Sequence, residues 1–255
     1  MISVYKGLFA IYWIEAIICV VAGTVLTMFF PEHIIAIILV MFLILLATLM
    51  VLMKVTHDKF KNEVMSLLYD CRAQDYMDKV ESLLGNRRSK SLRSTYAWLM
   101  ALGCDVIGDY EAMRAHCNNI TVKTHMSEYH RRMCSYYVEM DQIDLANKEI
   151  ESLKALASAA GGPERAHIEQ YIGECVRAVK IKHHDIEGLD QHFEGAVSKA
   201  EPVLLTRVSA AETYGQVLIL KGEYEQAKKQ LQFASKYGGD TKYKKYADTL
   251  LGSIN

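Results

Sequence analysis

The sequence predicts an all-α protein in which a transmembrane helical hairpin, residues 1–57, precedes a helical repeat domain, residues 58–255. The first observation is an uneven distribution of charge, because the first 53 residues contain only Lys6, Glu15 and Glu32 as charged side chains. The second is that amphipathic helices alternate with short turns throughout the densely charged remainder. Together these patterns indicate a membrane segment followed by one water-soluble domain.

The bulk composition limits the classes of protein to which the chain can belong. It has 255 residues, 51% of them hydrophobic, which is enough to bury a sizeable core. The formal net charge is -1 at pH 7, so there is no overall electrostatic case for a nucleic-acid partner. Only 3 prolines and 15 glycines are present, which argues against a long disordered linker.

The six cysteines form no CxxC pair, and most fall on apolar faces of the predicted helices. They are Cys19, Cys71, Cys104, Cys117, Cys134 and Cys175. A metal site would need closely spaced ligands, and a disulfide framework is usual in smaller, denser chains. We therefore expect buried free thiols in a reducing compartment, with a metal site or disulfides as the alternatives.

Two apolar runs near the start of the chain predict the hairpin. Gly7–Phe30 and Ile34–Met53 are each long enough to cross a bilayer, and Pro31-Glu32-His33 separates them. A cleaved signal peptide would have a shorter apolar region followed by soluble sequence. We therefore expect two uncleaved membrane spans.

Basic residues flank the hairpin at its two open ends. Lys6 precedes the first span, Lys54, Lys59 and Lys61 follow the second, and the turn between the spans has no Lys or Arg. The positive-inside rule then predicts that both termini and the helical domain are cytoplasmic. Because no targeting sequence is visible, we prefer a bacterial inner membrane.

One stripe of small and polar residues, which we call the polar stripe, runs along one face of the first span. Glu15, Cys19, Gly23 and Thr27 follow one another at i, i+4 spacing on one helix face. One interpretation is contact with a membrane helix of a partner, as a homo- or hetero-oligomer, in which Glu15 pairs with a donor on that helix. The other is that the stripe packs on the second span while Glu15 is protonated or reaches toward the headgroups.

The clearest helix pair of the domain lies near the end of the chain. Residues Ala211–Gly239 read as two amphipathic helices joined at Gly222, with small residues at Gly215, Ala227 and Ala234 that allow close packing. This pattern resembles a tetratricopeptide repeat, a helical pair of about 34 residues with small residues at these positions.

The same pattern recurs upstream. Tyr76 and Tyr110 are 34 positions apart, and Ile143 follows 33 positions after Tyr110. The resemblance implies a tetratricopeptide-like α-solenoid of about five helix pairs, with a related α-solenoid as the alternative. The expected later elements are His125–Met140 with Ile143–Ala157, Pro163–Lys182 with Asp185–Ala200, and a closing helix around Tyr243–Leu251 whose outer face, Lys242, Lys244, Lys245 and Asp248, is polar.

The resemblance also implies a concave groove lined by the first helix of each pair. The residues in that register are Trp98, Asp105, Glu128, Arg131, Tyr171, Glu174, Glu212 and Gln216. Aromatic side chains with charged neighbours suit a peptide-binding surface, and the glutamates indicate a mixed or acidic groove. The alternative for each residue is an ordinary exposed or partly packed helix position.

A short basic segment lies between the first two helix pairs. Arg87, Arg88, Lys90 and Arg93 are candidates for contact with anionic lipid headgroups. The alternative is a solvated loop between repeats.

No recognised arrangement of catalytic residues is visible. The sequence contains no HExxH, P-loop or GxSxG motif, and His125 and His130 are spaced too poorly for a zinc pair. We therefore expect no enzyme, no metal and no cofactor. The predicted function is a membrane-anchored scaffold or adaptor that binds a protein partner on the cytoplasmic side. The alternative is an accessory subunit of a membrane transport or secretion complex, engaged through its transmembrane helices.

Overall fold

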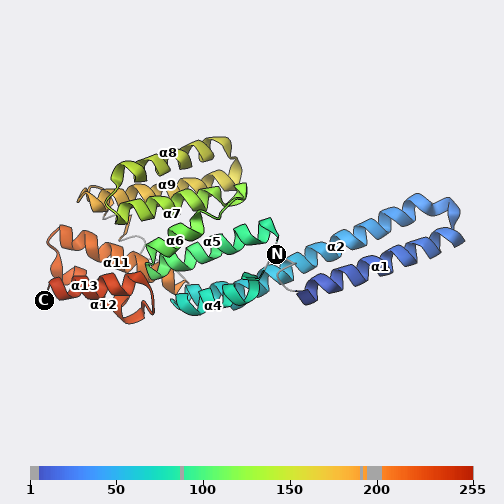
Figure 1. The fold of residues 1–255 in the computed structure, drawn as a ribbon, viewed down its shortest axis with the longest axis horizontal. Helices are drawn as coiled ribbons and strands as arrows, with labels where there is room; N and C mark the ends of the chain where they lie inside the picture. Colours follow the sequence, from blue (N-terminus) through green and yellow to red (C-terminus); the bar gives the residue numbers. More distant parts are fainter. Residues whose placement is uncertain (1–5, 87–88, 190–191, 194–202, 255) are drawn as a thin grey trace. The chain divides into compact units, whose positions relative to one another are not determined.

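The computed structural model describes residues 6–86, 89–189, 192–193 and 203–254 (Figure 1). Within these ranges the secondary structure is entirely helical, which confirms the all-α prediction. The chain divides into two compact units, Met1–Ser66 and Leu67–Asn255.

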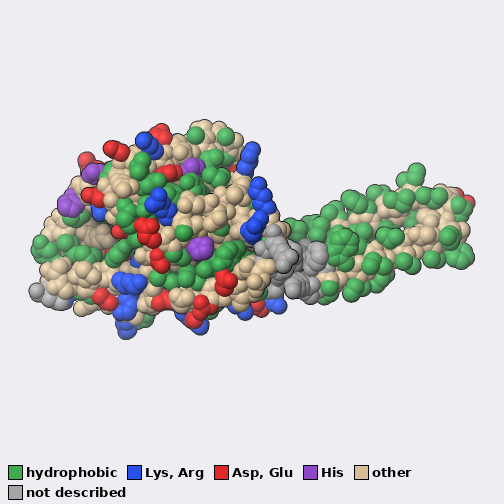
Figure 2. Space-filling model, viewed as in Figure 1, with side chains coloured by type: hydrophobic (Ala, Val, Ile, Leu, Met, Phe, Trp, Pro, Cys, Tyr) green, Lys and Arg blue, Asp and Glu red, His purple; other side chains and the backbone are tan. Residues whose placement is uncertain are grey.

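The first unit is a hairpin of two long helices. Its elements are α1 (Lys6–Phe29), a 3-10 turn (Pro31–His33), α2 (Ile34–Phe60) and one π-helical turn (Lys61–Met65). Both helices are long and apolar enough to cross a membrane. Their hydrophobic side chains face outward all along the hairpin (Figure 2), and a surface of this kind is typical of contact with lipid or with another protein.

The second unit contains the amphipathic helices. They are α3 (Ser66–Tyr69, which starts at the end of the first unit), α4 (Ala73–Leu84), α5 (Lys90–Ile107), α6 (Tyr110–Cys117), α7 (Met126–Glu139), α8 (Ile143–Ala159), α9 (Gly162–Lys182), α11 (Leu204–Leu220), α12 (Tyr224–Tyr237) and α13 (Lys242–Ser253). From α4 to α9 each helix packs on the next, and α11, α12 and α13 form a second group (Figure 1). The predicted helix at residues 185–200 falls mostly outside the described residues.

Five of the described helices, α3, α5, α7, α9 and α11, end in the same turn. In each turn one residue has a left-handed backbone, namely Cys71, Gly108, Asp141, His184 and Gly222, with φ between 57 and 85°. The next N–H donates to the carbonyl five positions earlier, at 2.8 to 2.9 Å: Arg72 to Leu67, Asp109 to Cys104, Gln142 to Tyr137, Asp185 to Lys180 and Glu223 to Leu218. This Schellman geometry satisfies carbonyls at the helix end and directs the chain back along the first helix. A turn that recurs in this way indicates a repeated helix pair.

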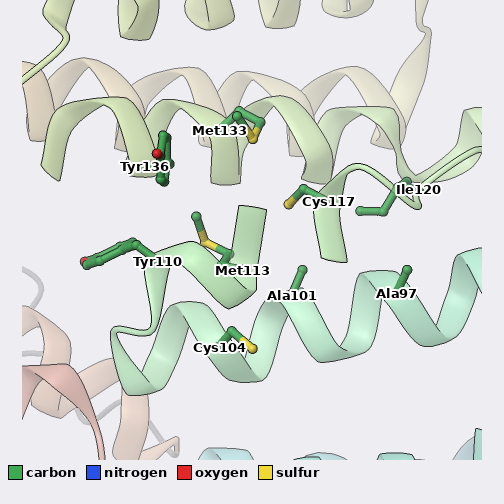
Figure 3. Packing of buried hydrophobic residues seen from close by; sticks show 9 residues of the cluster. All are labelled: Ala97, Ala101, Cys104, Tyr110, Met113, Cys117, Ile120, Met133 and Tyr136. Carbon is green, nitrogen blue, oxygen red and sulfur yellow. The ribbon is translucent and has the colours of Figure 1, made fainter. Parts of the chain in front are cut away.

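Small and sulfur-containing side chains fill the core between the pairs. Figure 3 shows Ala97, Ala101 and Cys104 on α5, with Met113 and Cys117 on α6 between them and α7. The small side chains on α5 leave room for the neighbouring helix.

The last helix pair packs as closely as its small residues predict. A Cβ on Gly215 would lie 2.6 Å from Leu231 Cδ2, and Ala227 and Ala234 are fully buried. All six cysteines are free and buried, as expected. Burial raises the pKa of Cys71, Cys104 and Cys117 to about 11, so these thiols are protonated at neutral pH.

The end of the chain returns to the first helix pair. The Asp240 carboxylate accepts the backbone N–H groups of Ala73 and Gln74 at 2.7 Å each and so caps α4. Next to it, Gly239 approaches Cys71 so closely that a Cβ would lie 2.1 Å from the Cys71 carbonyl oxygen. The last helix, α13, also packs against α5 of the second pair. In an extended solenoid, the end of the chain would not reach the first two pairs.

The expectation of a solvent-facing closing helix is therefore wrong for Lys242. This side chain is only 8% exposed, and its Nζ lies 2.8 Å from Asp105 Oδ1 on α5. The physical reason is that Asp105 is itself buried and needs a cation. Lys244, Lys245 and Asp248 do carry the exposed polar face that was predicted for this helix.

Candidate binding site in the helical domain

Five of the predicted groove residues meet at one place in the domain. Arg131 on α7 lies 3.7 Å from Asp105 on α5, 3.7 Å from Glu128 on its own helix and 3.5 Å from Glu174 on α9. Its guanidinium also lies over the Tyr171 ring, 5.2 Å from the centroid. The register that placed these residues on successive first helices therefore brings them together.

A second arginine completes this arrangement. Arg132 is 1% exposed and forms an ion pair with Glu128, whose carboxylate also accepts the Tyr171 hydroxyl. Burial acts to raise the pKa of Glu128, but the charges of Arg132 and Arg131 lower it to about 2.

The Asp105 carboxylate closes the other side of the same arrangement. Burial acts to raise its pKa, but Lys242 and Arg131 lower it to about 2. The charges of this cluster, which we call the ion network (Asp105, Glu128, Arg131, Arg132, Tyr171, Glu174 and Lys242), thus neutralise one another. Paired groups of this kind offer little free charge to a ligand.

Trp98 lies outside the ion network. Its ring stacks on His125, with centroids 4.7 Å apart and planes 12° apart. Among the described residues, nothing accepts a hydrogen bond from its buried Nε1. The Trp98 ring is thus partly covered by the chain itself, and the His125 ring occupies one of its faces.

The remaining two groove residues, Glu212 and Gln216, line a separate cavity of about 520 Å³. Its walls come from α7, α9, α11 and α13: Ser135, Val138, Glu139, Ala178, Ile181, Lys182, His184, Glu212, Thr213, Gln216, Ile219, Leu220, Lys242, Tyr243, Tyr246, Thr249 and Leu250. A volume of this size falls in the range of ligand and peptide pockets. We call it the central cavity.

Two carboxylates are held in the central cavity in different ways. Glu139 accepts the hydroxyls of Tyr110 at 3.0 Å and Tyr246 at 3.2 Å. Glu212 is 2% exposed and accepts bonds from its own helix, from the Gln216 amide and the Thr213 hydroxyl. Burial raises the pKa of Glu212 from 4.5 to about 7, against the lowering effects of the Gln216 amide and the Lys242 charge.

Three residues of these two regions were missed by sequence reasoning. Lys242 was placed on the wrong face of its helix, and Glu139 and Tyr246 were not singled out. The signal for Lys242 is indirect, since a predicted buried Asp105 requires a cation, and nothing local to α13 identifies which one.

In the first unit, the polar stripe faces the other helix of the hairpin. The Thr48 hydroxyl on α2 donates to Glu15 Oε1 at 2.5 Å, and Cys19 is buried. A Cβ on Gly23 would lie 3.6 Å from Met41 Cγ, and the Thr27 hydroxyl donates to the Thr24 carbonyl. In this arrangement the stripe packs on the second helix of the hairpin, which is the second of the two interpretations given for the sequence. A space of about 480 Å³, lined by Cys19, Val20, Gly23, Thr24, Thr27, Ile34, Ile37, Ile38, Met41, Phe42 and Leu45, remains between the two helices.

The predicted headgroup contact is described only in part. Lys90 and Arg93 are exposed in the first turn of α5, where the Ser89 hydroxyl accepts the Leu92 N–H at 3.2 Å. Arg87 and Arg88 lie outside the described residues. The exposure of Lys90 and Arg93 fits both a lipid contact and a solvated segment.

Over the described ranges, no group of three His, Cys, Asp or Glu side chains is placed to hold a metal ion. His130 instead has its Nδ1 2.6 Å from Glu149 on α8. Comparison of the chain with protein-family models, curated proteins and solved structures finds no match.

Proposed function

We propose that the protein is a membrane-anchored adaptor whose helical domain binds a segment of a protein partner on the cytoplasmic side of the membrane. The observation that carries this proposal is the central cavity, about 520 Å³ in volume, with walls from four different helices. A cavity of this size with both apolar and polar lining suits a peptide segment. The ion network, by contrast, has its charges paired within the protein.

The anchor in this proposal is the hairpin. Its outward-facing apolar side chains, such as Ile35 at 84% exposed and Met28 at 76%, would be costly in water and favourable in lipid. In this proposal both termini are cytoplasmic, which the lysines at the open ends of the hairpin support under the positive-inside rule, and the inner membrane of a bacterium is the proposed location.

The repeat pattern supports a scaffold function. Five equivalent turns and close packing at Gly215 are the features expected of a tetratricopeptide-like array, and such arrays are typically protein-binding surfaces. The proposal includes no catalytic residue, cofactor or metal.

The test is photo-crosslinking of the full chain in its native membrane, with a benzoylphenylalanine at a cavity residue. We expect a specific protein adduct that is lost when Thr249, a cavity-lining residue on α13, is replaced by Trp to fill the space. The matched control is Thr206→Trp, at an exposed threonine of α11 outside the cavity lining. No adduct at any cavity position, or equal loss in both variants, would contradict the adaptor proposal.

A second candidate is the accessory subunit of a membrane complex, engaged through the hairpin. The observation that favours it is the space of about 480 Å³ beside Gly23 and Thr27, which a further membrane helix could enter. In that case Gly23→Leu would abolish co-purification of a partner, whereas Thr249→Trp would leave it intact. The same two variants therefore separate the two functions.

A further inference from the structure

The central cavity contains more negative than positive charge that is free to meet a ligand. Glu212 and Glu139 both line it, and no Lys, Arg or His among the described residues lies within ion-pair distance of either carboxylate. Their hydrogen bonds come from an amide and from hydroxyls, which donate without neutralising charge.

The two lysines of the lining already have acidic partners. Lys242 Nζ lies 2.8 Å from Asp105 Oδ1 and 3.1 Å from the Tyr110 hydroxyl. Lys182 Nζ lies 4.0 Å from Asp141, which is outside the cavity lining. The lining lysines are thus paired with carboxylates other than the two that face the cavity.

Burial makes this imbalance significant. A carboxylate that is 2% exposed would be poorly solvated when ionised, and its neighbours on α11 supply only neutral donors. A cationic group on a ligand would stabilise the ionised carboxylate strongly, because the attraction between opposite charges is stronger where water is excluded. Buried carboxylates with perturbed protonation are therefore candidates for functional sites.

The rest of the lining suits an aliphatic chain. Val138 on α7, Ile181 on α9, Ile219 and Leu220 on α11, and Leu250 on α13 all contribute to it. Long basic side chains bury their methylene stems on apolar surfaces of this kind while the charged end meets an acid. The volume leaves room for the backbone of the segment that carries such a side chain.

We propose that the central cavity binds a lysine or arginine side chain of the partner's segment, with the cationic end on Glu212 and Glu139 and the stem on the apolar wall. This inference rests on the proposed adaptor function, since it names the chemistry of the segment that the adaptor holds. It makes Glu212 a specificity-determining residue.

The first arm of the test measures the chemistry of the site without a partner. The full chain in lipid nanodiscs is titrated at pH 8, where Glu212 is ionised, with pentylammonium, which imitates a lysine side chain, and with pentanol. Binding is followed by saturation-transfer NMR against empty nanodiscs. We expect saturable binding of pentylammonium, at least fivefold weaker in Glu212→Gln and in Glu139→Gln. Glu225→Gln, an exposed glutamate on α12, should bind as the wild type does. Equal binding of pentanol, or an unchanged affinity in Glu212→Gln, would overturn the cation site.

The second arm identifies the source of the cation. Peptides crosslinked to benzoylphenylalanine at position 220, a lining residue on α11, in native membranes are sequenced, and each Lys or Arg in the captured segment is changed to Gln. One of these changes should lower the crosslinking yield at least tenfold, as should Glu212→Gln. A captured segment without Lys or Arg, or one indifferent to these changes, overturns the inference while the adaptor function stands. Binding of pentylammonium with no captured protein overturns the adaptor function and assigns the site to a free amine.

Discussion

The helical domain buries charge in two regions, and they differ in how that charge is balanced. In the ion network, Arg131 alone contacts three carboxylates, and Lys242 and Arg132 supply two further cations. In the central cavity, Glu212 and Glu139 meet only neutral donors. The pKa values follow this difference, since Asp105 and Glu128 are lowered to about 2 whereas Glu212 is raised to about 7.

The two kinds of charge balance have different physical consequences. A self-neutralised network connects α5, α7, α9 and α13 and fixes their relative positions, so it acts within the protein. A buried carboxylate without a cationic partner destabilises the fold when it is ionised. A cation that binds beside it removes this cost. Apart from Trp98, the residues predicted for the groove thus lie in two regions that differ in charge balance.

The largest expected effect comes from removing a charge from the ion network. Lys242→Met leaves the Asp105 carboxylate buried beside Arg131 alone, and we expect a loss of about 3–5 kcal/mol in the free energy of unfolding. The measurement is urea unfolding of the full chain in detergent, followed by Trp98 fluorescence in a Trp13→Phe background.

The control for this change lies on the same helix. Lys244 forms an exposed i,i+4 pair with Asp248 at 2.9 Å, and Lys244→Met should cost less than about 1 kcal/mol. If Lys242→Met were as mild as Lys244→Met, the ion network would not be what holds α13 against α5.

In the central cavity, removing a charge should raise the free energy of unfolding instead of lowering it. The pKa of Glu212 is raised from 4.5 to about 7 in the folded state, so the folded protein binds the proton more tightly than the unfolded chain does. Stability from this group is therefore complete below pH 4.5 and is lost as the pH rises through 7. A shift of this size corresponds to about 3 kcal/mol, which Glu212→Gln should recover at pH 8.

The measurement is the difference in unfolding free energy between wild type and Glu212→Gln from pH 5 to pH 8. Taking the difference cancels the contributions of His116 and His125, whose pKa values burial lowers, because both histidines are present in both proteins. Lys242 and Glu139, whose charges act on the pKa of Glu212, are present in both proteins. A difference that does not grow with pH would show that Glu212 titrates normally, and the contrast between the two regions would disappear.

The helix pairs and their register could be predicted from the sequence because they depend on local patterns. Gly108 and Gly222 mark left-handed turns that glycine adopts without strain, and Gly215 marks a close helix contact. The equivalent turns at Cys71, Asp141 and His184 were harder to recognise because no glycine marks them.

The closure of the domain could not be predicted in the same way. Lys242 and Asp105 are separated by 137 positions, and Asp240 caps a helix 167 positions earlier. A periodic sequence pattern does not predict such contacts, because they depend on the angles at which successive helix pairs pack along the whole array. The same limit explains why Glu212 and Gln216 were grouped with Arg131, although they line a different region.

The smallest expected effects come from one matched pair of substitutions. In each region, a Tyr→Phe change removes a hydroxyl that donates a hydrogen bond to a carboxylate. Tyr171→Phe removes the hydroxyl that donates to Glu128, and Tyr246→Phe removes one of two that donate to Glu139. Hydrogen bonds to charged groups contribute about 1.5–3 kcal/mol, and we expect Tyr171→Phe to approach the lower value. Tyr246→Phe should cost less, because Tyr110 continues to donate to Glu139 at 3.0 Å.

The pair also changes the two regions differently in function. Because the ion network is internally balanced, Tyr171→Phe should leave pentylammonium binding unchanged. Tyr246→Phe leaves Glu139 with one donor fewer and a stronger need for a cation, so binding should tighten by about twofold to fivefold, equivalent to about 0.4–1 kcal/mol. Weaker pentylammonium binding in Tyr246→Phe would indicate that the phenol itself contacts the ligand. An equal change in both variants would indicate that the ion network and the central cavity act as one site.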